Sequence, residues 1–258
     1  MMEFGMPTLI EHASLGESAA LCRELGLQFV EINMNLPAYQ VEKLDAGALC
    51  AEGGVYYTLH LDEDMNPFGF NPAVALAYRA TARAAVRIAH AAGMPIVNMH
   101  MPQGVHFKLP GGKVYLFDRY WDDVRDQIAR FRDDMTRAAG DSVAICVENT
   151  TFCGFSHLPD ALDLLLESPA FQLTYDCGHD HVEGGVALPF YAAHSGRLRH
   201  FHLHDASDSA CHLTLGAGEV DIRNMLRMAH GCRVVIETKD APGLGASVNW
   251  LIERNFLP

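Results

Sequence analysis

The sequence predicts an α/β protein built as one (β/α)8 barrel of the TIM type, a single domain covering residues 1–258. Short, β-branched apolar runs alternate eight times with longer segments of helical periodicity, which is typical of a closed parallel sheet. An open doubly wound sheet normally carries a Gly-rich phosphate loop after an early strand, and no such loop is found here. With 258 residues, 49% of them hydrophobic, the chain can bury one large core.

The first four β/α units are expected between residues 8 and 139. Apolar residues recur every three or four positions in the helical segments, and Gly93 ends the third helix as a capping glycine. The strands and their helices are expected at residues 8–10 with 14–25, 27–33 with 38–51, 55–61 with 72–92, and 95–101 with 118–139.

The last four units are expected between residues 142 and 256. Their strands are short runs rich in Val, Ile, Leu and Phe, and no repeat or low-complexity linker divides the chain. The strands and their helices are expected at residues 142–149 with 156–167, 171–176 with 186–194, 198–204 with 220–230, and 233–237 with 246–256.

The charge balance favours a small-molecule substrate. The formal net charge is -13 with His neutral, and basic residues are scattered among acids along the helices. A nucleic-acid binder normally presents a basic face to the phosphates, so no nucleic-acid partner is expected. No run of about 18 apolar residues is found, so no membrane partner is expected either. A homo-oligomer is compatible with the sequence.

The cysteines and the amino terminus indicate a reducing compartment, with the cytoplasm as the default. Residues 1–7 lack a basic region followed by an apolar stretch, so we expect no signal peptide. The cysteines are odd in number, scattered, and form no C-x-x-C pair, which argues against a disulfide framework. They are Cys22, Cys50, Cys146, Cys153, Cys177, Cys211 and Cys232.

Acidic and imidazole side chains end nearly every expected strand. In a parallel barrel these ends converge on one mouth, where active sites are built. A single His at such a position is more often a hydrogen-bonded structural residue than a ligand, but a whole ring favours a metal site. The ring contains Glu31, His60, His100, Glu148, Asp176, His202, His204 and Glu237.

This ring predicts a bound divalent cation. Burying several carboxylates together without a cation would be costly and would force some of them to protonate. Carboxylate oxygens combined with imidazole nitrogens suit Mn²⁺ or Zn²⁺ best, and Mg²⁺, Co²⁺ or Fe²⁺ are alternatives.

Short motifs around these residues resemble the xylose isomerase-like barrel superfamily, which contains sugar and sugar-phosphate isomerases and epimerases and the endonuclease IV branch (AP endonuclease family 2). Each motif is weak alone, but one motif falls on each successive strand over most of the chain. They are Cys-Val-Glu148-Asn-Thr, Tyr-Asp176-Cys-Gly-His179, His202-Leu-His204-Asp, Leu215-Gly-Ala-Gly-Glu-Val-Asp221 and Val-Val-Ile-Glu237-Thr.

The resemblance implies a metal-dependent isomerase or epimerase. In epimerases of this superfamily one ion is bound by Glu, Asp, His and Glu. The resemblance implies that the corresponding ligands in this chain are Glu148, Asp176, His202 and Glu237. The two glutamates, Glu148 and Glu237, would be catalytic: one removes a proton next to a carbonyl and the other returns it, through a metal-stabilised enediolate. Substrate-binding roles are expected for His60, His100, His179, His204 and His212.

The endonuclease IV branch provides the alternative function, a phosphoesterase with several ions acting on a small phosphoester. There His60 and His100 would hold a second ion together with Glu148. The third ion of that branch needs Asp-x-His, but Ala210 stands at the Asp position, and Asp205 or Asp208 is a weak substitute. A further alternative is a non-catalytic binding protein with the same barrel. The presence of all four metal ligands argues against it.

Several residues have plainer interpretations. Residues 102–120 form a segment longer than an ordinary loop, read either as a lid or as a small hairpin turning at residues 110–112. A hairpin surface is the preferred place for His106 and Lys108, although either could meet an anionic substrate group. Lys239 is expected to be a solvated loop lysine, and Glu31 a supporting, hydrogen-bonded carboxylate.

Overall fold

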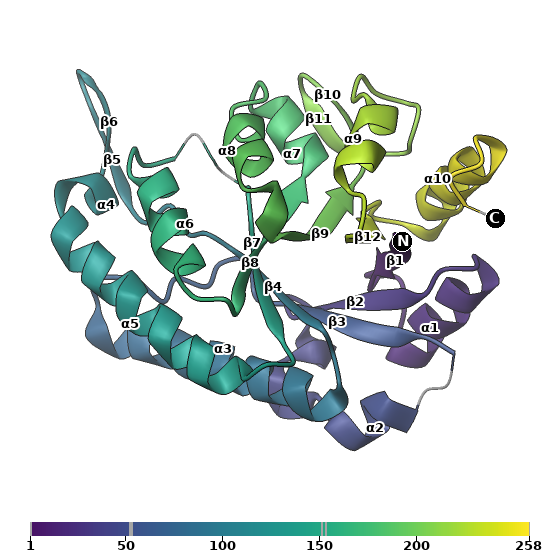
Figure 1. The fold of residues 1–258 in the computed structure, drawn as a ribbon, viewed down its shortest axis with the longest axis horizontal. Helices are drawn as coiled ribbons and strands as arrows, with labels where there is room; N and C mark the ends of the chain where they lie inside the picture. The colour runs from purple at the N-terminus through teal and green to yellow at the C-terminus, as the bar shows by residue number, and fades with distance from the viewer. Residues whose placement is uncertain (1, 52–53, 151, 153, 258) are drawn as a thin grey trace.

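The protein is described by a computed structural model over residues 2–51, 54–150, 152 and 154–257, so Cys153 lies outside the described residues. Eight parallel strands close into a barrel in the order β1-β12-β9-β8-β7-β4-β3-β2, which confirms the predicted TIM barrel (Figure 1). The strands are β1 (Glu3–Pro7), β2 (Phe29–Asn33), β3 (Tyr56–His60), β4 (Ile96–His100), β7 (Ala144–Glu148), β8 (Phe171–Asp176), β9 (Leu198–Leu203) and β12 (Arg233–Ile236).

Helices surround the barrel and cover its apolar outer surface (Figure 1). The longest, α3, begins where Asn71 accepts hydrogen bonds from the backbone of Ala73 and Val74, and ends at Gly93, whose φ of 70° is left-handed. The helices are α1 (Leu15–Glu24), α2 (Ala46–Ala51), α3 (Pro72–Ala92), α4 (Leu116–Arg119), α5 (Trp121–Ala139), α6 (Leu158–Leu166), α7 (Cys177–Val182), α8 (Leu188–Ala193), α9 (Ile222–Met228) and α10 (Ala241–Glu253).

Two antiparallel hairpins and three 3-10 turns complete the described structure. The hairpin β5 (His106–Leu109) with β6 (Gly112–Tyr115) follows β4 and projects away from the body of the molecule (Figure 1). The second hairpin, β10 (Asp205–Ser207) with β11 (Ala210–Leu213), follows β9. The turns are η1 (Pro37–Tyr39), η2 (Val41–Lys43) and η3 (Ser195–Arg197).

Some predicted elements are wrong in position or length. The first strand lies at Glu3–Pro7 and not at residues 8–10, because Phe4 and Met6 are buried whereas Ile10 is 82% exposed. Gly5 obscured this strand in the sequence, but a Cβ there would lie 2.5 Å from the ring of Phe29, so the position requires glycine.

The helix predicted at residues 38–51 is two 3-10 turns followed by the short α2. The chain is extended at Gln40, whose side chain donates a hydrogen bond to the carbonyl of Met34 and so holds the segment against the end of β2. Helix α7 and the hairpin β10–β11 were not predicted. Helix α10 begins five residues earlier than expected, because Asp240 caps it and Pro242 fits its first turn.

The strand register brings the predicted site residues to one rim. His100 lies beside Glu148 across β4 and β7, and Asp176 lies beside His202 across β8 and β9. Glu237 directly follows β12, and its backbone N–H donates to the carbonyl of Leu203 at the end of β9. Residues distant in sequence therefore share one end of the barrel.

No helix among the described residues combines the length and the apolar character that crossing a membrane requires.

Candidate metal centre

The four predicted metal ligands meet around one nitrogen of His202. Its Nδ1 atom lies 3.0 Å from Oε2 of Glu237, 3.3 Å from Oε2 of Glu148 and 3.8 Å from Oδ2 of Asp176. The side chains of His202, Glu148 and Asp176 are at most 1% exposed, and that of Glu237 is 13% exposed. Strands β7, β8, β9 and β12 thus bring three carboxylates to one imidazole, in a site that is almost closed to solvent.

The geometry around His202 suits ligands of one cation better than hydrogen-bonded partners. Within the described residues, neither Nδ1 of His202 nor Oε2 of Glu237 makes a hydrogen bond, although the two buried atoms lie 3.0 Å apart. Ligand atoms about 2.1 Å from a common ion, separated by about 90–110°, lie about 3.0–3.4 Å from one another. The donor set of one imidazole and three carboxylates therefore fits a divalent cation.

Glu31 lies behind His202, in the supporting place that the sequence predicted. Its Oε1 atom is 2.9 Å from Nε2 of His202, and its Oε2 atom is 2.7 Å from Nε2 of His200. Thr58 also donates to Glu31. A carboxylate on the far nitrogen of a ligating imidazole orients the ring and strengthens it as a ligand.

A neutral amide inside the barrel holds Glu148, and sequence reasoning missed it. Nδ2 of Asn98 donates to Oε2 of Glu148 over 2.6 Å, while Oδ1 of Asn98 accepts a hydrogen bond of 2.6 Å from Thr174. Asn98 and Thr174 are both fully buried. Because a carboxylate only accepts, the amide nitrogen of Asn98 must face Glu148, and the Thr174 hydroxyl then donates to the amide oxygen. This chain of hydrogen bonds holds the carboxylate of Glu148 in one orientation.

The two histidines predicted for a second ion lie on the other side of Glu148. Nε2 of His60 is 3.4 Å and Nε2 of His100 is 3.6 Å from Oε2 of Glu148. Nδ1 of His60 lies 2.7 Å from the carbonyl of Leu61, and since a carbonyl only accepts, this nitrogen carries the proton. When the ring is neutral, its second nitrogen, Nε2, faces Glu148 with a lone pair that an ion or a substrate can use.

His204 is placed to hold Asp176. Its Nδ1 accepts the backbone N–H of His212 over 2.8 Å, so Nε2–H points at Asp176, 3.1 Å from each carboxylate oxygen. The backbone of Asp176 is clamped by Asn149, which accepts from its N–H and donates to its carbonyl. His204 is fully buried, which favours a positioning role over the predicted contact with substrate.

His179 and His212 line the more open part of the site. Nδ1 of His179 lies 3.6 Å from Oδ2 of Asp176 and 3.8 Å from Oε1 of Glu148, without a hydrogen bond to any described residue. The His212 ring lies 5.1 Å from that of His179 and has a strained backbone φ of 58°. Both residues are only partly buried, so the substrate contacts predicted for them stay a prediction.

Lys239 is an exposed loop lysine, as predicted, but it also contacts the candidate site. Its Nζ donates to Oε1 of Glu237 over 2.8 Å, although more than half of the side chain is exposed. Both residues line a cavity of about 300 Å³ between the loops that follow β1, β2 and β12. Lys239 thus partly neutralises the most accessible carboxylate of the site.

Histidines and carboxylates shift one another's proton affinity strongly. Burial works to raise the pKa of Glu148 and of Glu237, yet the neighbouring His202 holds both well below their usual range. Burial works to lower the pKa of His202, but the same carboxylates raise it well above its usual value. Glu148 likewise outweighs burial at His60 and raises its pKa to about 9. The protein alone must balance its carboxylates with protonated histidines, and a cation would supply the same charge.

The residues considered for a third ion do not join this cluster. Asp205 accepts hydrogen bonds from the backbone of Ala206, Gly216 and Val220, so its carboxylate shapes the following loop. Asp208 is exposed in the hairpin β10–β11, and Ala210 offers no ligand. Residues 102–120 contain the predicted hairpin, on which His106 and Lys108 are exposed.

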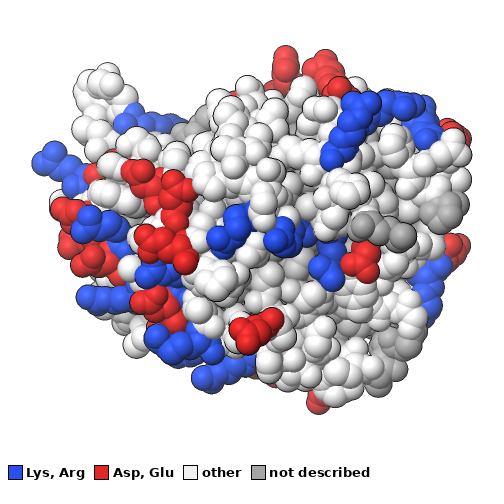
Figure 2. Space-filling model, in the orientation of Figure 1, with Lys and Arg blue, Asp and Glu red and all other residues white. Residues whose placement is uncertain are grey.

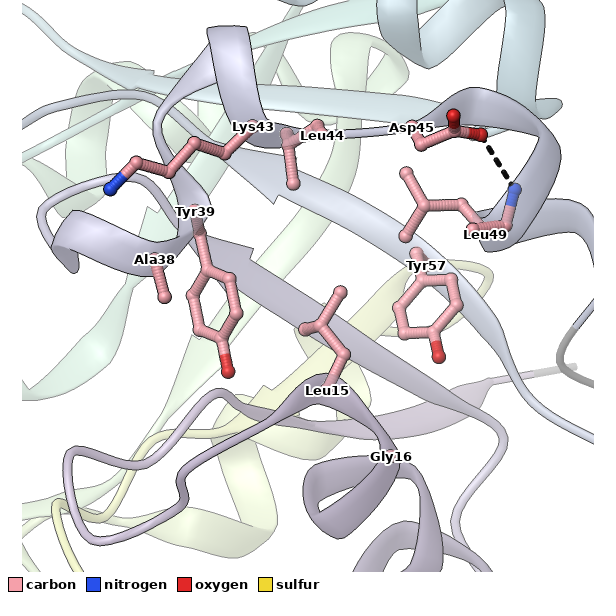
Figure 3. A pocket seen from close by; sticks show the side chains of 10 residues that line it. Leu15, Gly16, Ala38, Tyr39, Lys43, Leu44, Asp45, Leu49 and Tyr57 are labelled. Atoms are coloured by element: carbon pink, nitrogen blue, oxygen red, sulfur yellow. Dashed lines mark hydrogen bonds between the residues drawn. The ribbon is translucent and has the colours of Figure 1, made fainter.

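A separate pocket of about 320 Å³ lies between α1, the 3-10 turns, α2 and β3 (Figure 3). Leu15, Tyr39, Leu49 and Tyr57 form much of its wall, together with Lys43 and Asp45. None of the predicted site residues lines it. The chemistry-bearing residues are at the barrel mouth, so this pocket is not the candidate site.

Solved structures with this fold are similar over nearly the whole chain. A D-tagatose 3-epimerase-like protein has a TM-score of 0.78 at 21% identity, covering 99% of this chain and 97% of that chain. The apo form of 3-keto-D-glucoside 4-epimerase from E. coli has a TM-score of 0.74 at 16% identity, covering 98% and 100%. D-allulose 3-epimerase from Methylomonas sp. in complex with D-allulose has a TM-score of 0.72 at 16% identity, covering 98% and 96%. At these identities the likeness establishes the fold.

The comparison with curated proteins gives no match. The family model of the xylose isomerase-like TIM barrel, in contrast, matches residues 19–254, which confirms the resemblance carried by the strand-end motifs. The chain therefore belongs to the xylose isomerase-like TIM barrel family.

Proposed function

We propose that the protein is a divalent-metal-dependent isomerase or epimerase acting on a sugar or a related polyhydroxy carbonyl compound. The observation that carries the proposal is the convergence of Glu148, Asp176 and Glu237 on Nδ1 of His202, within 3.0–3.8 Å. Three buried carboxylates around one imidazole suit a divalent cation, and a barrel mouth is where such a site acts on a small molecule.

Glu148 and Glu237 are the proposed proton carriers. They approach His202 from β7 and from the end of β12, which are separated in the barrel by β8 and β9. A substrate between them would present opposite faces of one carbon to the two carboxylates, so one could remove a proton and the other return it. When bound, a divalent ion supplies Lewis-acid stabilisation of the negative charge that forms on the substrate oxygen.

The rim supports an uncharged sugar better than a sugar phosphate. Glu11 follows β1, and Asp62, Glu63 and Asp64 follow β3, with Glu11, Glu63 and Asp64 exposed. Lys239 at the mouth is already paired with Glu237. A phosphate would meet these carboxylates at an electrostatic cost. The names of the similar structures, which include a D-tagatose 3-epimerase-like protein, a D-allulose 3-epimerase and an L-ribulose 3-epimerase, agree with uncharged ketoses as candidates.

The test is solvent hydrogen exchange with Mn²⁺ supplied to the protein. The wild type should incorporate deuterium from D₂O at one carbon of the sugar that it interconverts, and Glu237→Gln should lose at least about 10²-fold of this exchange because the proton carrier is gone. Mass spectrometry of the recovered sugar measures the label. Exchange that persists in Glu237→Gln with every sugar turned over would refute the two-glutamate mechanism.

A metal-dependent phosphoesterase is the second candidate, favoured by His60 and His100. Both Nε2 atoms lie within 3.6 Å of Oε2 of Glu148, an arrangement that could share that carboxylate between two ions. Metal analysis separates the functions: one Mn-like ion per chain supports the isomerase, and two or more zinc ions support the phosphoesterase. If the protein cleaves none of a broad panel of phosphoesters when Zn²⁺ and Mn²⁺ are supplied, the phosphoesterase function is excluded.

A further inference from the structure

A cluster of two histidines and one cysteine lies next to the candidate metal centre. His179 belongs to α7, and Cys211 and His212 are neighbours on β11. Each of the three offers one ligand atom, and these atoms all lie within 4.8 Å of one another. Cys211 is a free thiol, and all three residues are only partly buried, so an ion from solution can reach them. We call this cluster the thiol site.

A β-bulge in the hairpin β10–β11 turns Cys211 and His212 to the same side. Successive side chains of a regular strand point to opposite faces, which would separate these two neighbours. Here the register shifts so that both lie opposite the single residue Ala206, and His212 has a left-handed φ of 58°. Both side chains consequently reach His179. Among the residues that the structure describes, only Asn255 shares a positive φ without being glycine, and such strain is typical of ligand sites.

The hydrogen bonds of the two histidines leave nitrogen lone pairs available. Nδ1 of His212 lies 3.2 Å from the carbonyl of Glu237, and because a carbonyl only accepts, the neutral ring has its proton on Nδ1 and its lone pair on Nε2. The backbone N–H of His212 donates to His204 over 2.8 Å, which fixes the residue in place. Nδ1 of His179 is buried and has no hydrogen-bond partner in the described part of the chain.

The surface around this hairpin favours a cation as the ligand. Asp208 is exposed in the hairpin, and the chain has a formal net charge of -13. In Figure 2 acidic side chains stand at the upper edge of the molecule, where Figure 1 places the hairpin β10–β11. Such a field raises the local concentration of cations.

We propose that His179, Cys211 and His212 bind a thiophilic divalent ion, zinc above all, at a site separate from the candidate metal centre. Thiolate and imidazole ligands select zinc, whereas Mn²⁺ and Mg²⁺ prefer carboxylate oxygens such as those around His202. Tetrahedral zinc would hold the two nitrogens and the sulfur about 3.3–3.6 Å apart, which small rotations of partly buried side chains can achieve. The thiol gives its proton to solvent as its sulfur binds the ion, and a water molecule takes the fourth position.

Cobalt(II) is the probe for this site, because a thiolate bound to Co²⁺ gives an intense near-ultraviolet charge-transfer absorption that carboxylate and imidazole ligands do not give. Reduced protein is stripped with a chelator, saturated with Mn²⁺ and titrated with Co²⁺. The wild type should develop the thiolate band, and Cys211→Ser should not. Cys50→Ser is the matched control: it removes an exposed free cysteine outside the thiol site, so the band should remain.

His212→Asn is the second variant, because Asn adopts a left-handed backbone readily and so removes the ring without adding strain. Competition with a chromophoric zinc chelator measures the affinity. Cys211→Ser and His212→Asn should each raise the zinc dissociation constant of this site at least about tenfold, since each loses one of three protein ligands. Circular dichroism and thermal unfolding of the stripped variants should match the wild type.

Three outcomes would overturn the proposal: a wild type without the thiolate band, a band that persists in Cys211→Ser, or a band that disappears in Cys50→Ser. None of these readouts needs turnover, so the thiol site and the proposed isomerase activity can fail separately. Counting zinc in Cys211→Ser also removes this ion from the metal analysis that separates the isomerase from the phosphoesterase.

Discussion

The two glutamates of the candidate site sit in very different surroundings. The side chain of Glu148 is 1% exposed. Its Oε2 atom accepts a hydrogen bond from Asn98 and faces nitrogens of His60, His100 and His202. The side chain of Glu237 is 13% exposed, pairs with Lys239 and borders a cavity of about 300 Å³. One carboxylate is fixed by the barrel interior, and the other stands at its opening.

Under the proposed function, this difference divides two tasks between the glutamates, holding an ion and exchanging a proton. A carboxylate held by several buried donors keeps its charge and position, which suits an anchor for the cation. A carboxylate with a solvent-facing side and a flexible partner can pass its proton to water between turnovers. We therefore expect changes on the Glu148 side to affect metal binding and stability most, and changes on the Glu237 side to affect turnover.

The largest effect is expected for His202→Ala, because His202 contacts both sides of the site. Its removal leaves Glu31, Glu148 and Glu237 buried without their shared positive partner, and breaking a buried pair costs about 3–5 kcal/mol. The free energy of unfolding, measured in urea without metal, should fall by that amount, and metal content after dialysis should fall to background. A variant within about 1 kcal/mol of the wild type would mean that the carboxylates are not coupled through this ring.

A pH-dependent loss of stability is expected from His60 on the Glu148 side, in protein stripped of metal by a chelator. Its folded pKa of about 9 exceeds the value of 6.5 expected for an unfolded chain, so the folded state holds the proton more tightly. The resulting stabilisation, up to about 3 kcal/mol, is fully present below pH 6.5 and is lost as pH rises through 9.

His60→Gln isolates this contribution from the other histidines. The difference in unfolding free energy between wild type and variant should shrink as pH rises from 6.5 to 9. Urea titrations at five or more pH values across this window would measure it. A difference that is constant, or that grows with pH, would show that Glu148 does not raise the pKa of His60.

A smaller effect is expected for Asn98→Ala, which removes the donor to Glu148. A buried hydrogen bond to a charged group contributes about 1.5–3 kcal/mol, and loss of a partner behind a metal ligand typically costs about 10–100-fold in metal affinity. Competition with a fluorescent chelator measures the affinity. Thr174→Ser keeps the hydroxyl that orients Asn98 and serves as the control, so an equal loss in both variants would point to packing instead.

The contrast between these residues also shows what sequence could predict. Glu148, Asp176, His202 and Glu237 belong to the ring of charged strand ends that convergence in a parallel barrel predicts, and the resemblance to the superfamily singled out these four as ligands. Asn98 and Thr174 were missed because they are neutral, lie within strands and become partners only through the packing of β4, β7 and β8 inside the barrel. No spacing in the sequence encodes that meeting.

The fold, too, could be predicted from the sequence in some regions and not in others. Periodicity predicted the long helices and the inner strands, whose apolar patterns are set by burial on the barrel. It failed at β1, where Gly5 makes room for Phe29, and at residues 38–51, where Gln40 bonds to the end of β2. In both places a contact with a distant or crowded neighbour, and not local propensity, decides the conformation.

The smallest change is expected for Lys239→Met, on the Glu237 side. Glu237 outweighs burial and raises the pKa of Lys239, but 54% of the lysine side chain is exposed, so solvent screens the pair. The free energy of unfolding should change by less than about 1 kcal/mol, while kcat/KM falls about two- to tenfold and the deficit narrows at high salt. Lys239→Arg, which keeps the charge, should stay closer to the wild type. A decrease in kcat/KM of about 100-fold that does not depend on salt would mean that Lys239 contacts the substrate directly. The Glu237 side of the site would then hold its residues in place as firmly as the Glu148 side does.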